Sequence, residues 1–112
     1  MPLLKIKTNI KINNKTAFAE AASKTTSELL GKPESYVMIN IEDDQCLMFA
    51  GNHNPCALLS LKSLGLPEDS TPAFSKALCA FIKTHTAIDE SRIYIEFNNP
   101  DRHMWGWDSR TF

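Results

Sequence analysis

A strand–helix–strand pattern that occurs twice constrains the fold of this chain more than any other feature. In the first copy, residues 4–7 alternate between apolar side chains and lysines, which is typical of a half-buried strand. Apolar residues then recur at helical spacing over residues 18–29, and Gly31 and Pro33 supply the signals that end a helix. Residues 36–41 form an almost continuous apolar run of strand length. This order predicts a strand, a helix and a second strand.

The same order returns after a polar turn. Residues 46–50 are interpreted as a return strand, and residues 55–61 as the strand that opens the second copy. Proline suits the first turn of a helix, so residues 71–85, which begin Thr-Pro, predict a second helix. Residues 92–97 alternate again and predict the closing strand.

The two copies form an internal repeat within a single domain, residues 1–112. They cover about residues 2–50 and 55–98, and a C-terminal tail, 99–112, follows. Right-handed crossovers place both helices on one face of a four-stranded mixed sheet. The sequence therefore predicts an α+β fold, built as a two-layer α/β sandwich.

The strands contain more apolar residues than two helices are expected to cover. Met38, Ile41, Leu58, Leu59 and Leu61 cannot all point towards the helices. Exposed apolar patches of that size usually mark an interface between proteins. We therefore expect the second face of the sheet to be apolar and the chain to form an oligomer.

Composition excludes several classes of function. Twelve basic and thirteen acidic residues give a formal net charge of -1, which argues against nucleic acid and membrane surfaces as partners. No secretory-type apolar stretch opens the chain, so a cytoplasmic location is expected. The three cysteines have no C-x-x-C spacing and the four glycines do not cluster, so neither a metal site nor a cofactor is expected.

Six short segments together carry a family resemblance that runs the whole length in one register. They are Met1-Pro2, Gly31-Lys32-Pro33, Asn54-Pro55-Cys56-Ala57-Leu58, Ser60-Leu61-Lys62-Ser63-Leu64-Gly65, Arg92-Ile93-Tyr94-Ile95 and Gly106-Trp107-Asp108-Ser109-Arg110-Thr111-Phe112. Together they resemble the macrophage migration inhibitory factor family of the tautomerase superfamily. Members of that family are homotrimers of a βαββαβ protomer, with three sheets around a central channel, so the resemblance implies a homotrimer with active sites between subunits.

The resemblance also implies an activity, the keto–enol tautomerisation of arylpyruvates such as phenylpyruvate. The family's general base is an amino-terminal proline that is exposed when the initiator methionine is removed, and Pro2 matches it. Lys32 matches the cation that binds the substrate carboxylate, and Ser63 and Leu64 match the loop that contacts it. Tyr94 matches a tyrosine that the neighbouring subunit contributes.

Two tryptophans complete the implied site. Trp105 and Trp107 match the walls of the family's aromatic pocket, and Phe112 belongs to the tail that contacts other subunits. Acid–base chemistry requires a base with a pKa near 7, and an apolar pocket and a nearby cation both lower the pKa of an amine. Leu3 and the tryptophans are expected to supply the first effect on Pro2, and Lys32 the second.

Two departures from the family pattern limit what is transferred. Family members with thiol–disulfide oxidoreductase activity carry C-A-L-C, whereas here Cys56 is followed three positions later by Leu59, so this activity is expected to be absent. Glu96 stands where the family commonly has asparagine, on the same strand face as Tyr94. A carboxylate there would repel an anionic substrate or raise the pKa of the proline.

Two other functions stay open at this point. One is a cytokine-like protein that binds a receptor. The other is a different superfamily reaction on the same proline, a decarboxylation or a dehalogenation, whose enzymes typically add arginines near the proline. The three arginines of this chain, Arg92, Arg102 and Arg110, all lie in its last quarter, which favours the tautomerase.

Overall fold

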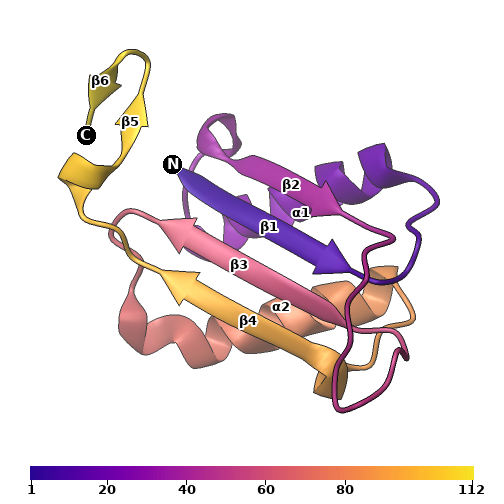
Figure 1. The fold of residues 1–112 in the computed structure, drawn as a ribbon. Helices are drawn as coiled ribbons and strands as arrows, with labels where there is room; N and C mark the ends of the chain where they lie inside the picture. Colours follow the sequence, from indigo (N-terminus) through magenta and orange to yellow (C-terminus); the bar gives the residue numbers. More distant parts are fainter.

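The computed structural model describes residues 1–112 as a four-stranded sheet with two helices on one face (Figure 1). Its elements are β1 (Pro2–Thr8), α1 (Lys15–Leu30), β2 (Met38–Glu42), β3 (Ala57–Ser63), α2 (Thr71–His85), β4 (Ile93–Asn98) and a short hairpin of β5 (Gly106–Trp107) and β6 (Arg110–Thr111). The strand order of the sheet is β2-β1-β3-β4. The pairs β1–β2 and β3–β4 are parallel, and the central pair β1–β3 is antiparallel. The predicted α+β fold is therefore confirmed.

One hydrophobic core lies between the sheet and the helices. Fourteen buried residues form it, because alternate residues of β1 and β3 face the apolar stripes of α1 and α2. Neither helix is long and apolar enough to cross a membrane. The largest core side chains are those of Leu4, Ile6, Leu59, Leu61, Phe18, Phe74, Leu78, Phe81 and Ile82.

The second sheet face differs from the sequence expectation. Leu58 and Met38 do face away from the helices, but Leu59, Leu61 and Ile41 face the core. Between the outward apolar residues stand three lysines and two glutamates, Lys5, Lys7, Lys62, Glu42 and Glu96. The prediction of an apolar second face was therefore wrong, because the period-two alternation of each strand pairs its outward leucine or methionine with charged neighbours.

The predicted return strand at residues 46–50 is also wrong. These residues belong to a long loop between β2 and β3, and their only ladder contact is an isolated bridge between Phe49 and Asn52. Positive φ angles of 54° at Asp44 and Ala50 turn the chain at both ends of this segment. Such turns interrupt the extended backbone that a paired strand requires.

Two side chains next to the ends of strands hold this loop instead of strand pairing, Asn9 directly after β1 and Arg92 directly before β4. The Asn9 amide donates to the carbonyl oxygens of Leu47, His53 and Asn54 at 3.0–3.1 Å, and its oxygen accepts from the Cys56 N–H at 2.9 Å. Arg92 donates to carbonyl oxygens of the same loop.

Replacing Asn9 should therefore destabilise the protein measurably. We expect Asn9→Ala to lower the free energy of unfolding by about 1–3 kcal/mol, because it leaves loop carbonyls and one N–H without partners. Urea denaturation followed by circular dichroism measures the change. Asn13→Ala, at an exposed asparagine, is the matched control. Equal denaturation midpoints for the two variants would contradict this account of the loop.

Candidate active site

The end of α1 fixes the position of Lys32. Gly31 adopts a left-handed conformation with φ 63°, which stops the helix and turns the chain. The N–H groups of Gly31 and Lys32 then bond to the carbonyl oxygens of Glu28 and Ser27 at 3.4 and 3.1 Å. The Ser27 hydroxyl donates to the Lys32 carbonyl oxygen at 2.6 Å. The backbone of Lys32 is thus held from both sides.

The Lys32 side chain reaches the end of the sheet at which β1 begins and β3 finishes. Its Nζ donates to the Ser63 Oγ at 2.7 Å and to the Leu64 carbonyl oxygen at 2.6 Å. Ser63 is fully buried and pairs with Pro2 in the β1–β3 ladder. Two of the three ammonium hydrogens are therefore used inside the protein, and the third remains for a ligand. Partial burial lowers the pKa of Lys32.

A cavity of about 350 Å³ lies over the first residues of β1 and β2. The hairpin β5–β6 stands beside the N-terminus and projects away from the four-stranded sheet (Figure 1). Pro2 is fully buried at the base of β1. The lining is mostly apolar and consists of Met1, Pro2, Leu3, Ser35, Tyr36, Val37, Met38, Trp105, Gly106, Trp107 and Phe112.

Aromatic rings from two distant segments form one wall of this cavity. Tyr36 meets Trp107 edge-on with ring centroids 6.1 Å apart, and Trp107 stacks with Phe112 at 6.2 Å. The Phe112 N–H donates to the Trp105 carbonyl oxygen at 3.0 Å, which ties the end of the chain to the wall. A planar apolar group fits such a wall better than a polar one.

An amine at this end of β1 loses basicity. Burial lowers the pKa of the Met1 α-amino group, and the nearby positive charge of Lys32 lowers it further. Both effects disfavour the protonated form, the first by removing water and the second by repulsion between like charges. The same two effects act on any amine placed at the start of the strand.

The structure brings together six of the eight residues that the sequence assigned to the site. Pro2, Trp105 and Trp107 line the cavity, and Lys32 contacts Ser63 and Leu64 beside it. No group of three or more His, Cys, Asp or Glu side chains is arranged to hold a metal ion.

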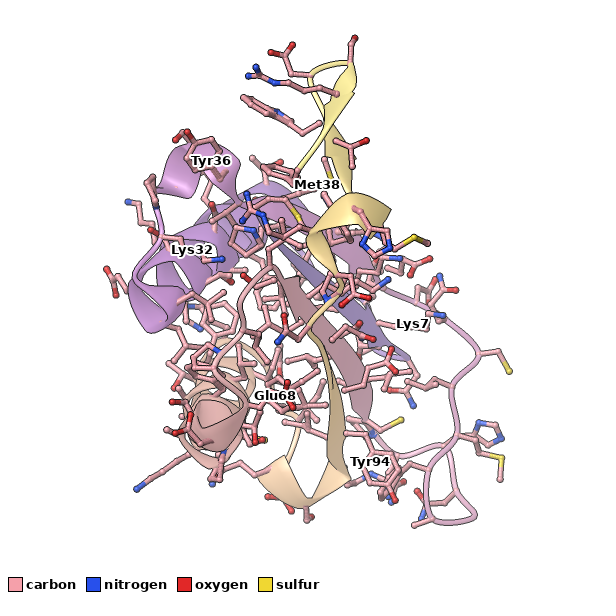
Figure 2. The ribbon with its side chains drawn as sticks, turned by 90° about the vertical axis from the view of Figure 1, so that its left-hand side faces the viewer. Lys7, Lys32, Tyr36, Met38, Glu68 and Tyr94 are labelled. Atoms are coloured by element: carbon pink, nitrogen blue, oxygen red, sulfur yellow. The ribbon has the colours of Figure 1, made fainter.

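Tyr94 and Glu96 do not join this cluster. Tyr94 lies at the start of β4, at the opposite end of the molecule from Lys32 and Tyr36 (Figure 2). It is 66% exposed and meets Phe49 edge-on at 4.7 Å. Glu96 lies on the outward sheet face, in a hollow that it shares with lysines. Within one chain, neither residue can contact a ligand bound beside Pro2.

Sequence reasoning missed one segment of the cavity lining, residues 35–38, whose largest side chains are those of Tyr36 and Met38. Tyr36 was assigned to a strand, but it lies in a 3₁₀ turn, Glu34–Tyr36, and its ring faces Trp107. Met38 was assigned to the sheet without a role at the site. Their position in the sequence was the signal that could have identified them. Both residues follow shortly after Gly31–Pro33, the segment that ends α1 and positions Lys32.

Comparisons with known proteins agree over the whole chain. A sequence model of the family described as macrophage migration inhibitory factor matches residues 1–112. A macrophage migration inhibitory factor homolog of Brugia malayi is 34% identical over 114 residues, spanning 100% of this chain and 99% of that protein. The structure of the macrophage migration inhibitory factor from Trichinella spiralis has a TM-score of 0.91 at 32% identity, covering 98% of this chain and 99% of that chain. A homologue from Prochlorococcus marinus gives 0.92 at 32% identity, covering 98% of both chains.

Proposed function

This chain belongs to the macrophage migration inhibitory factor family, and from that premise we propose that it is a tautomerase that interconverts the keto and enol forms of arylpyruvates such as phenylpyruvate. The observation that carries the proposal is the position of Pro2. The residue lies at the start of β1, in a cavity with aromatic walls, and its ladder partner Ser63 accepts a hydrogen bond from Lys32.

Removal of Met1 turns the Pro2 nitrogen from an amide into a basic secondary amine. In ketone-to-enol conversion this amine takes a proton from the carbon next to the carbonyl group. The C–H electron pair becomes the new C=C bond, and the carbonyl oxygen takes up a proton, which the prolinium can return. The reverse reaction follows the same steps backwards. A base of this kind works only in its neutral form, so its pKa must lie near the working pH.

Lys32 is proposed to have two roles. Its remaining N–H binds the substrate carboxylate, which fixes the carbon acid beside Pro2. Its positive charge also disfavours protonation of the amine, as it does for the Met1 amine in this structure. The aryl ring then packs among Tyr36, Trp105 and Trp107.

The proposed active form is a homotrimer in which Tyr94 contacts substrate in the neighbouring subunit's cavity. The strand register supports this: Tyr94 pairs with Leu58 and Pro2 pairs with Ser63, at opposite ends of β3, so a Tyr94 that contacts substrate beside Pro2 must come from another copy. Glu96 would reach a substrate only by the same route, and its effect on substrate preference belongs to the same proposal. No thiol–disulfide activity is proposed, because Cys56 is buried and Leu59 fills the position of a second thiol.

We expect sedimentation velocity at micromolar concentration to give a particle of three 12.6 kDa protomers. Tyr94→Ala should stay trimeric and raise the KM for phenylpyruvate, whereas Tyr36→Ala should raise KM through the subunit's own cavity. In mixed trimers of the two variants, a shared site can take Tyr36 from a Tyr94→Ala subunit and Tyr94 from a neighbouring Tyr36→Ala subunit. Some sites then have both tyrosines, and part of the lost activity should return. A fully active monomer would contradict the shared site.

The activity itself is tested with purified protein whose Met1 removal has been verified by mass spectrometry. The enol of phenylpyruvate absorbs in the ultraviolet, so its ketonisation is followed directly against a buffer blank and against Pro2→Ala. That variant keeps a primary amine and should be slower without being inactive. If the processed, unmutated protein gives the same rate as the buffer blank, the proposal is refuted.

A further inference from the structure

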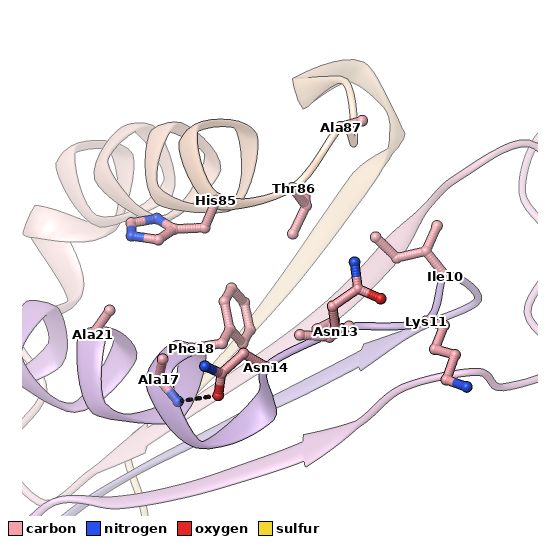
Figure 3. A pocket seen from close by; sticks show the side chains of 11 residues that line it. Ile10, Lys11, Asn13, Asn14, Ala17, Phe18, Ala21, His85, Thr86 and Ala87 are labelled. Carbon is pink, nitrogen blue, oxygen red and sulfur yellow. Dashed lines mark hydrogen bonds between the residues drawn. The ribbon is translucent and has the colours of Figure 1, made fainter.

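The largest cavity of the molecule, about 510 Å³, lies away from Pro2 (Figure 3). It opens where the chain leaves β1 and enters α1, and the C-terminal end of α2 forms its other side. None of its lining residues lines the Pro2 cavity. These residues are Ile10, Lys11, Ile12, Asn13, Asn14, Ala17, Phe18, Ala21, His85, Thr86 and Ala87.

Aromatic rings provide the apolar part of this cavity. His85 packs on Phe81 with ring centroids 4.3 Å apart and meets Phe18 edge-on at 6.1 Å. The His85 Nδ1 lies 3.0 Å from the Phe81 carbonyl oxygen. A carbonyl oxygen only accepts, so this contact fixes the proton on Nδ1 and holds the ring in place. Figure 3 shows His85 above Phe18 and Ala21, across the cavity between the two helices.

Two polar residues of the lining leave donors available to a ligand, Lys11 and Asn14. Lys11 is exposed and takes part in no salt bridge. The Asn14 Oδ1 already accepts from the Ala17 N–H at 3.1 Å, which leaves its NH₂ group to donate. No Asp or Glu lines the cavity. The nearby Asp43 is engaged by the Ile12 N–H at 2.9 Å and by Lys15 at 3.3 Å.

We propose that this cavity is a second ligand site, which binds a small aromatic carboxylate. The ligand ring packs against the apolar surface that Phe18 and His85 form together, and the carboxylate meets Lys11 and the amide of Asn14. Cavities of roughly 300–1,000 Å³ with an apolar lining and a few placed polar groups are the usual form of small-molecule sites. A cationic ligand is disfavoured because the lining offers it no carboxylate. This proposal does not depend on the tautomerase activity.

Two probes test the site by ¹H–¹⁵N correlation spectra, 2-naphthoate and the neutral 2-naphthalenemethanol. We expect naphthoate to shift the amide signals of residues 10–21 and 85–87 and to bind more tightly than the alcohol. Lys11→Gln should weaken naphthoate binding at these signals about tenfold, the usual effect of losing one charged hydrogen bond, and leave the alcohol unchanged. Lys24→Gln, at an exposed lysine of α1 that does not line the cavity, is the matched control.

A second pair of variants tests the location by filling it. Ala17→Phe places a ring in the cavity from an exposed helical position, and Ala80→Phe makes the same change on α2 away from it. Only the first should abolish the shifts of residues 10–21 and 85–87. The proposal fails if naphthoate shifts only signals around Pro2 and Trp107, if it shifts none, or if Lys11→Gln binds it as tightly as the control. Since no readout uses turnover, an inactive tautomerase would leave this test intact.

Discussion

Protein that retains Met1 should tautomerise phenylpyruvate about 10²- to 10⁴-fold more slowly than protein that begins at Pro2, the usual contribution of a positioned general base. With Met1 in place, the Pro2 nitrogen is an amide and has no useful basicity. Met1 also lies in the cavity itself, so it blocks the space that the substrate needs. Its own α-amine is one residue further from the base position, and it cannot take over the geometry of the prolyl nitrogen.

The comparison requires two homogeneous samples and one control. Mass spectrometry establishes the N-terminus of each sample, and sedimentation shows that both have the same oligomeric state. Processed protein that has been acetylated at Pro2 is the control, because it removes basicity without adding a side chain. Retained-Met1 protein that keeps the rate of processed protein, in the same oligomeric state, would show that Pro2 is not the base.

Lys32→Gln should have the second largest effect, on substrate binding and on pH dependence together. Loss of the charged hydrogen bond to the carboxylate should raise KM roughly tenfold or more. Loss of a neighbouring positive charge should raise the pKa of the proline, because protonation is then less disfavoured. Since the neutral amine is the proposed base, the rise of activity with pH should move to higher pH. Rates measured across a pH series report both changes.

The design must separate this effect from a loss of structure. Lys32 also holds the buried Ser63 and the Leu64 carbonyl oxygen, so unfolding is monitored alongside. Lys76→Gln, at an exposed lysine of α2, is the matched control. A folded Lys32→Gln protein with an unchanged KM and an unchanged pH profile would remove Lys32 from the mechanism.

The order of helices and strands could be predicted from the sequence because local patterns carry it. Gly31 and Pro33 mark a helix end that depends on backbone geometry alone, and Pro72 marks a helix start. Residues 46–50 were misassigned because an apolar run of strand length looks the same in a loop. What excludes the strand is the positive φ at Asp44 and Ala50 together with the bonds from Asn9, and neither is visible in a local pattern.

The roles of the site residues stay predictions, whereas their positions can be compared with the structure. Pro2 and Lys32 were assigned from the family resemblance, and the structure places both at the same end of the sheet. The place of Tyr36 at Trp107 depends on the C-terminal hairpin standing beside the N-terminus, which residue spacing does not encode. The charged second face was not predicted for a different reason, because the composition of a whole strand hides the alternation of apolar and charged residues along it.

The claim that the Pro2 amine is the base is tested most directly by titrating that nitrogen. Processed protein labelled with ¹⁵N-proline gives the pKa of Pro2 from its chemical shift, and kcat/KM for phenylpyruvate is measured over the same pH range. We expect the two midpoints to coincide and to lie below the pKa of the amine in the free peptide Pro-Leu-Leu-Lys, because burial and Lys32 both disfavour its protonated form. A prolyl nitrogen that titrates like the free peptide, or an activity whose pH midpoint does not follow it, would contradict the account.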